Sequence, residues 1–223
     1  MSTPDLPEAP AIDEWHRTEI GGFWDEVGQL QFDFVTAEGL QASDYLLDVG
    51  CGSLRGGVHF IRYLEPGHYV GIDQSAEILA AGQEIELPRY GLVEKAPVLV
   101  EMADFGFARL NQQFGYAMAQ SVFTHLPLND IIRCLMNVER VLLPGGTFYA
   151  TFFDNPAGKR NLEPIDQPVA SGHPVISYFD RDPFHYDVAT FAWICEGTTL
   201  SVEHIGDWNH PRNQRMLRFR KEG

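Results

Sequence analysis

Two glycines that follow an apolar run form the most informative chemical pattern in the chain. Gly50 and Gly52 flank Cys51 just after a run that ends at Val49. Glycines at such a turn let the chain bend tightly, and they let a ligand approach the backbone without Cβ atoms in the way. The helix expected beyond the turn offers free N–H groups and the positive end of its dipole. The segment is therefore suited to binding a nucleotide-like ligand.

Two classes of ligand use a turn of this kind. A dinucleotide fingerprint has a third glycine where this chain has Arg55, and a large cationic side chain there disfavours a nicotinamide cofactor. Asp48, two places before the first glycine, is instead typical of methyltransferases, although Leu54 replaces the last glycine of their usual motif. Arg55 could bind a carboxylate of the ligand or turn outward to a structural acid.

Asp73 and Gln74 end the next apolar run, and Asp73 lies 21 residues after Gly52. A carboxylate at this point can accept hydrogen bonds from both hydroxyls of a bound ribose. The alternative is that Asp73 only caps the helix that follows it. Of the two roles we favour the ribose contact.

Polar and aromatic side chains also follow the third and fourth apolar runs. Asp104 could meet the amino group of an adenine while Phe105 packs on its ring. The alternative is an exposed aspartate in a turn and a phenylalanine in the core. Gln120 and Ser121 follow the fourth run, where an open α/β sheet binds its ligands.

The chain alternates short apolar runs with helical stretches, as βαβ units do. Strands are expected at 45–49, 69–72, 97–102, 116–121 and 147–153, and helices at 54–64, 76–87 and 128–142. Two last strands, 200–205 and 215–219, are joined by a polar connection too short for a helical crossover, so they must be antiparallel. We therefore expect an α/β, Rossmann-like fold: a mostly parallel seven-stranded sheet with one antiparallel strand and helices on both faces.

The successive motifs resemble, in order and spacing, those of class I S-adenosylmethionine-dependent methyltransferases; they lie at 48–57, 70–73, 103–105, 120–127 and 143–146. The likeness is greatest to a bacterial branch that carries Gly-Cys-Gly-Ser-Leu-Arg-Gly-Gly. The resemblance implies S-adenosylmethionine as cofactor and S-adenosylhomocysteine as product. It places the amino-acid portion of the cofactor at the glycine turn, the ribose at the second strand, the adenine at the third and the sulfonium near the fourth. The implied cofactor residues are Asp48, Gly50, Cys51, Gly52, Arg55, Asp73, Gln74, Asp104, Phe105, Gln120 and Ser121.

Three regions are expected along the chain. Residues 1–12 contain three prolines and predict a disordered tail, and residues 13–40 predict a helical N-terminal cap broken at Gly21-Gly22. Residues 41–223 form the methyltransferase domain. The aromatic residues of the cap could cover the cofactor or could simply pack on the sheet; they are Trp15, Phe23, Trp24 and Phe32, and Trp24 is the one most worth testing.

Three residues are candidates for the acceptor side of the site. His185 and Tyr186 lie in the long segment 154–187, whose length and polar, proline- and glycine-rich composition suggest a lid or binding loop. His125 follows the fourth strand and is a second candidate base, although such a histidine often only packs or caps a helix. His210 is expected to be structural. No metal site is expected, because no histidine has a partner at ligand spacing.

Charge and composition restrict the partners. The formal charge is −15 at pH 7, which disfavours a nucleic-acid substrate. No apolar run reaches the roughly 18 to 20 residues that span a membrane, and the N-terminus does not resemble a signal peptide. We expect a cytoplasmic enzyme that methylates an oxygen or nitrogen of a small-molecule acceptor. The alternatives are a non-catalytic protein that binds S-adenosylmethionine and, less favoured, a nicotinamide-dependent reductase.

Overall fold

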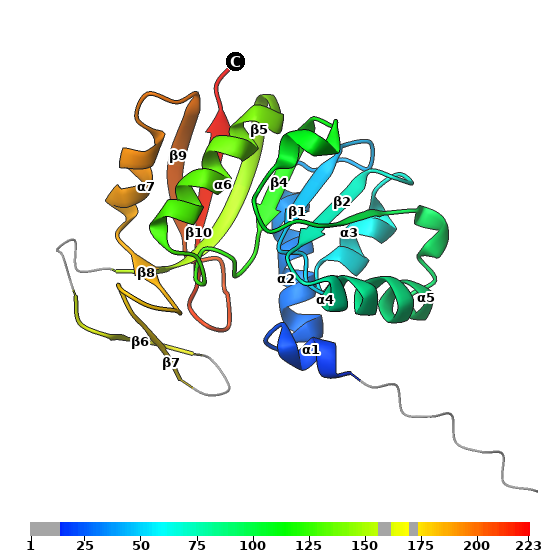
Figure 1. Cartoon of the computed structure of the whole chain (residues 1–223), viewed down its shortest axis with the longest axis horizontal. Coiled ribbons are helices and arrows are strands. Elements are labelled where there is room, and N and C mark those ends of the chain that lie inside the picture. Colours follow the sequence, from blue (N-terminus) through cyan, green and yellow to red (C-terminus); the bar gives the residue numbers. More distant parts are fainter. Residues whose placement is uncertain (1–13, 156–161, 170–173) are drawn as a thin grey trace, which may run out of the picture.

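A mostly parallel β-sheet organises the molecule (Figure 1). The computed structural model describes residues 14–155, 162–169 and 174–223, so the tail predicted for 1–12 lies outside the described residues. The strands follow the order β3-β2-β1-β4-β5-β10-β9, and β10 runs antiparallel to both of its neighbours. These strands are β1 (Leu46–Val49), β2 (Tyr69–Asp73), β3 (Val98–Glu101), β4 (Phe114–Ala119), β5 (Leu142–Asp154), β9 (Leu200–Gly206) and β10 (Arg215–Lys221).

The predicted fold class is thereby confirmed. All four residues of β1 are buried, because helices cover the central strands on both faces. Such strands read in the sequence as unbroken apolar runs, which is why their positions could be predicted.

The segment between β5 and α7 (Val188–Cys195) contains structure that the sequence did not predict. β6 (Ile165–Gln167) and β7 (Val175–Ser177) form a separate antiparallel pair. β8 (His185–Tyr186) pairs with the end of β5, so the main sheet has eight strands within the described residues. The described parts of this segment therefore contain short strands beside the carboxyl end of β5.

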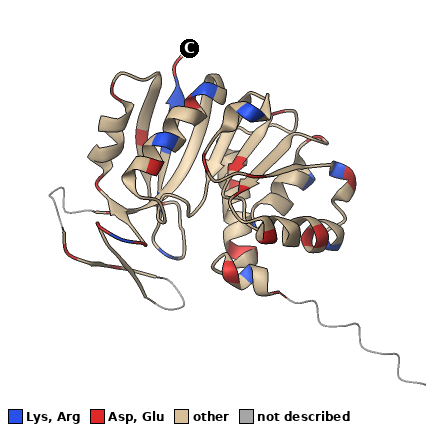
Figure 2. Cartoon of the chain, in the orientation of Figure 1, with Lys and Arg blue, Asp and Glu red and all other residues tan. Residues whose placement is uncertain are grey.

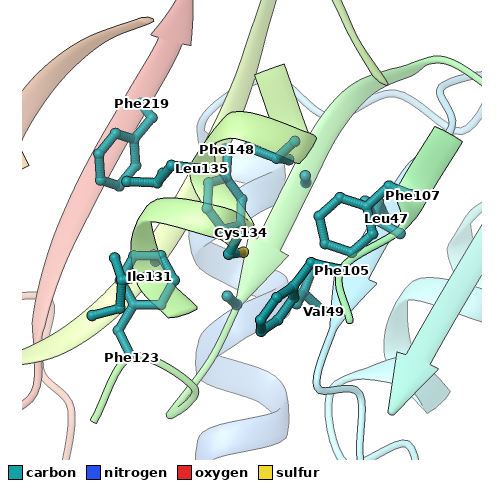
Figure 3. Close-up of a cluster of buried hydrophobic side chains, with 14 of the residues drawn as sticks. Leu47, Val49, Phe105, Phe107, Phe123, Ile131, Cys134, Leu135, Phe148 and Phe219 are labelled. Atoms are coloured by element: carbon teal, nitrogen blue, oxygen red, sulfur yellow. The ribbon is translucent and has the colours of Figure 1, made fainter. Parts of the chain in front are cut away.

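Two hydrophobic clusters lie on opposite faces of the sheet. One packs the sheet against α6 (Leu128–Val141) and α7, with Phe123, Phe148 and Phe219 at its centre (Figure 3). Each of these rings is fully buried and stabilises the fold by about 1.5–3 kcal/mol. The other cluster packs the sheet against α2 (Trp24–Ala37), α3 (Gly57–Tyr63) and the helical run formed by α4 (Ala76–Ala81), a π-helical turn (Gly82–Glu86) and α5 (Leu87–Arg89).

A buried carboxylate holds α1 (Trp15–Glu19) against this helical run. Glu86, in the π-helical turn, is fully buried and accepts two hydrogen bonds of 2.8 Å from Arg17. His16 Nε2 lies 3.3 Å from the same carboxylate, and burial lowers the pKa of His16. Trp24 donates from Nε1 to the hydroxyl of Tyr90 (2.9 Å) and packs in the core. These contacts fix the N-terminal cap on the domain.

Acidic and basic side chains are spread over many elements, with Asp and Glu in the majority (Figure 2). None of the helices in the described part of the chain combines the length and apolar character that crossing a bilayer requires.

Candidate active site

A cavity of about 750 Å³ opens at the carboxyl ends of the central strands. The link between α1 and α2 covers one side of it, and the segment between β4 and α6 forms the other. Of the predicted cofactor residues, ten line this cavity: Asp48, Gly50, Cys51, Gly52, Arg55, Asp73, Gln74, Phe105, Gln120 and Ser121.

The glycine turn has a backbone that only small residues tolerate easily. Gly50 has φ 70°, and a Cβ there would lie 2.5 Å from Val122 Cγ2. Gly52 has φ 57°. Leu54, which stands where the usual methyltransferase motif has its last glycine, has φ 78°. The leucine thus has a positive φ, which is uncommon for a residue with a side chain, and its side chain fills the core.

Asp48 lies at the base of the turn with its carboxylate almost fully buried. Its Oδ2 accepts a hydrogen bond of 2.6 Å from the hydroxyl of Tyr69. Burial is the main cause that raises the pKa of Asp48 to about 6. A cationic group in the cavity would favour the ionised form of this carboxylate.

Asp73 joins the second strand to the glycine turn. Its two carboxylate oxygens each accept one backbone N–H, from Gly52 and from Ser75, both at 3.0 Å. An ionised carboxylate can accept about four hydrogen bonds, so acceptor capacity remains on the side that lines the cavity.

Asp104 and Phe105, which follow the third strand, lie in different surroundings. Phe105 lines the cavity with φ 56°, whereas Asp104 is exposed and does not line it. Two hydrogen bonds from Arg109, of 2.8 and 2.6 Å, hold the Asp104 carboxylate and lower its pKa to about 2. The predicted adenine contact of Asp104 stays a prediction that this geometry does not favour.

Arg55 lines the cavity and is not turned outward to an acid. Its Nη1 donates to the carbonyls of Ile20 (3.3 Å) and Gly22 (2.7 Å). Its Nε is buried with no hydrogen-bond partner. Burial first, and then the charge of Arg212, lower the pKa of Arg55 to about 10. Of the two roles predicted for Arg55, the structural acid is excluded among the described residues.

A polar network forms the floor of the cavity beyond β4. Gln120 and Ser121 contact Gln214, whose Oε1 also accepts from Thr151 (2.7 Å). His210 Nε2 lies 3.0 Å from the amide of Gln120. Burial is the main cause that lowers the pKa of His210 to about 3, so this histidine is neutral and supports the network as expected.

His125 is the predicted acceptor-side residue that lines the cavity. Its Nδ1 lies 2.7 Å from Oδ1 of Asp182, and both side chains are more than half exposed. A carboxylate at this nitrogen holds the proton on Nδ1 and leaves Nε2 free as a base. The surrounding wall is largely apolar and contains Leu126, Pro127, Phe153, Val175 and Pro183.

His185 and Tyr186 do not line the cavity. They form β8, and pairing with β5 buries both side chains. His185 Nδ1 lies 3.1 Å from the hydroxyl of Ser177, and the hydroxyl of Tyr186 donates to the carbonyl of Leu126 (2.5 Å). A catalytic role for either residue therefore has no support from the geometry, because a buried strand forms where the sequence predicts an open loop.

The cavity residues that the sequence did not predict include Arg212 and Gln214. Both lie in the connection between β9 and β10, near the His-Pro-Arg sequence, and their role depends on contacts with residues about 90 or more positions away. The described residues contain no cluster of three or more His, Cys, Asp and Glu side chains that could hold a metal ion.

Part of the chain that forms this cavity is similar to known methyltransferases. Residues 47–148 match the model of a family described as a methyltransferase domain. The probable methyltransferase ltbC of Aspergillus luteorubrus is 32% identical over 116 residues, and the aligned region covers 48% of this chain and 39% of that protein.

Solved methyltransferases share the fold at low sequence identity. CcbJ from Streptomyces caelestis is 20% identical with a TM-score of 0.64, and the match covers 94% of this chain and 100% of CcbJ. Magnesium protoporphyrin IX methyltransferase from Synechocystis PCC 6803, solved with bound S-adenosylmethionine, is 13% identical with a TM-score of 0.62; that match covers 96% of this chain and 87% of the other. The fold of these solved structures thus extends over nearly the whole chain.

The residues that line the cavity have the chemistry that S-adenosylmethionine requires. A ribose diol would meet the free acceptor capacity of Asp73, and an adenine would meet Phe105. An α-amino acid carries an ammonium and a carboxylate, and the glycine turn presents the buried acid Asp48 and the unpartnered Nε of Arg55.

Proposed function

We propose that this protein is a methyltransferase that moves the methyl group of S-adenosylmethionine to an oxygen or nitrogen of a small organic acceptor. The observation that carries the proposal is the composition of the cavity. Its glycine-turn end presents groups for a nucleoside and an amino acid, and its other end is an apolar compartment with a histidine at its edge. Such a compartment suits an acceptor with an apolar body and one ionisable or polar group.

The sulfonium of the bound cofactor supplies a methyl group already activated for in-line displacement. The protein's own task is to hold the acceptor atom in line and to remove its proton. His125 Nε2 accepts that proton as the new bond to carbon forms, and Asp182 stabilises the resulting imidazolium through the 2.7 Å contact at Nδ1.

The test uses cofactor labelled in the methyl group. The protein is incubated with three separate fractions of a cell extract: small molecules, total protein and total RNA. We expect label in the small-molecule fraction. Label in protein or RNA would contradict a small-molecule acceptor, and no label in any fraction together with tight binding of S-adenosylhomocysteine would favour the non-catalytic alternative.

The role of His125 is tested in the same reaction. His125→Gln should slow labelling by about 10²- to 10⁴-fold, which is the usual contribution of a general base. Affinity for S-adenosylhomocysteine should not change, because the imidazole lies at the acceptor end. His68→Gln is the matched control, since His68 Nδ1 contacts a backbone carbonyl at 3.1 Å and the side chain does not line the cavity. Labelling by His125→Gln at the unmodified rate would refute the assignment.

A further inference from the structure

Two guanidinium groups from distant parts of the chain hold the same short segment over the cavity. Arg55, just after the glycine turn, donates to the carbonyls of Ile20 and Gly22. Arg212, from the connection between β9 and β10, donates from Nη2 to the carbonyl of Gly21 (2.8 Å). Both side chains line the cavity, so two positive charges meet at one of its edges.

This edge is the one beside the glycine turn. A Cβ placed on Gly52 would lie 3.0 Å from Ile20 Cγ2, so the segment 20–22 sits directly over the turn. The amino-acid portion of the cofactor is expected at the same turn. The two guanidinium groups are therefore placed at the amino-acid end of the cavity, whereas His125 belongs to the acceptor end.

The two cations have no anionic partner of their own. Among the described residues neither guanidinium forms an ion pair with a carboxylate, and the nearby Asp48 is bonded to Tyr69. Arg55 is only 8% exposed, and its Nε has no partner. Neutral carbonyls compensate a buried charge poorly, and placing two like charges together adds repulsion. The arrangement lacks an anion that would balance it.

We propose that Arg212 and Arg55 together bind one carboxylate, the α-carboxylate of the amino-acid portion of the cofactor. A guanidinium has five N–H donors, and only Nη1 of Arg55 and Nη2 of Arg212 donate to the segment 20–22, so donors remain for two charge-assisted bonds. Arg212 thereby becomes a binding residue that links three elements: the N-terminal cap, the glycine turn and the β9–β10 connection. The inference rests on the proposed cofactor.

The test compares two ligands by calorimetric titration. S-adenosylhomocysteine carries the α-carboxylate, whereas 5′-methylthioadenosine has the same nucleoside and thioether without the amino-acid group. Arg212→Gln should weaken binding of S-adenosylhomocysteine by about 10-fold or more, which corresponds to the loss of one charge-assisted hydrogen bond. Binding of 5′-methylthioadenosine should not change. Arg212→Lys, which keeps the charge without the fork, should give an intermediate loss and serves if Arg212→Gln does not fold.

Arg17→Gln is the control for the cap. Arg17 anchors α1 through Glu86 and does not line the cavity, so its loss should change the affinity for both ligands by the same factor. If Arg212→Gln also weakens both ligands equally, Arg212 only holds the cap and the inference is wrong. It is equally wrong if neither ligand is affected. A failure of the unmodified protein to bind S-adenosylhomocysteine would instead overturn the proposed function itself.

Discussion

Replacement of Asp73 by alanine should separate cofactor binding from the local role of this carboxylate. Each Asp73 oxygen already accepts one backbone N–H at 3.0 Å, from Gly52 and from Ser75. The remaining acceptor sites face the cavity and suit the two ribose hydroxyls. A hydrogen bond to a charged group contributes about 1.5–3 kcal/mol, so losing even one should weaken S-adenosylhomocysteine binding about 10- to 150-fold.

The same substitution should also lower stability. Two backbone N–H groups lose their acceptor, at about 1 kcal/mol each, which corresponds to a fall in Tm of about 4–8 °C for a chain of this size. Calorimetric titration must therefore be made well below the Tm of the variant, with circular dichroism as a check on folding.

Asp187→Ala is the matched control for Asp73→Ala. Asp187 makes the same kind of bond to the N–H two residues ahead, Ala189, at 2.8 Å, but does not line the cavity. The Asp187→Ala protein should be somewhat less stable, and its affinity for S-adenosylhomocysteine should not change. A folded Asp73→Ala protein that binds S-adenosylhomocysteine as tightly as the unmodified chain would refute the ribose assignment and leave Asp73 as a turn residue only.

Three further predictions concern Asp48, Gly50 and Glu86. Because burial raises the pKa of Asp48 to about 6, and a bound ammonium favours its ionised form, affinity for S-adenosylhomocysteine should rise with pH through this value. It should be about 10-fold weaker at pH 5 than at pH 7.5, and Asp48→Asn should abolish that difference in titrations at the two pH values. Gly50→Ala should lower the Tm more than Gly67→Ala. Both glycines have positive φ, but only at Gly50 would the added Cβ lie 2.5 Å from another side chain. Equal decreases in Tm would mean that the neighbouring side chain moves to relieve the clash. Glu86→Gln should destabilise the fold by about 3–5 kcal/mol in denaturant unfolding, because it removes the buried anion of Arg17 and leaves only the exposed Glu14 beside that guanidinium; an unchanged midpoint would contradict that role.

The sheet and the glycine turn could be predicted because their signals are local. A central strand such as Leu46–Val49 is buried along its whole length and reads as an apolar run. The tight turn requires positive φ at Gly50 and Gly52, and glycine adopts positive φ without a steric penalty. The methyltransferase prediction rested on these local patterns, and the family match over 47–148 confirms it for that part of the chain.

The rest of the site depends on contacts that no local pattern records. Arg212 reaches Gly21 across 191 positions of the sequence, and Gln214 reaches Ser121 across 93. His185 looked like a loop residue because β8 has only two residues and no apolar alternation of its own. Its burial results from pairing with β5, a tertiary effect that overrides local propensity.

Glu86 shows the same limit in the N-terminal cap. It lies near the end of the helix expected over 76–87, and no local pattern in the sequence marks it as buried. In the structure a π-helical turn carries it into the interior, where Arg17 bonds to it from 69 positions away. Helices α1 and α2 lie within the region predicted as a helical cap, and periodicity alone does not show how they are attached to the domain.

The central claim is that the cavity binds the methyltransferase cofactor, and calorimetric titration with S-adenosylhomocysteine tests it most directly. NADH serves as the competing ligand, because a dinucleotide is the other class of ligand that uses a glycine turn of this kind. The account predicts binding of S-adenosylhomocysteine near micromolar and no binding of NADH. Binding of NADH, or of neither ligand, would contradict it.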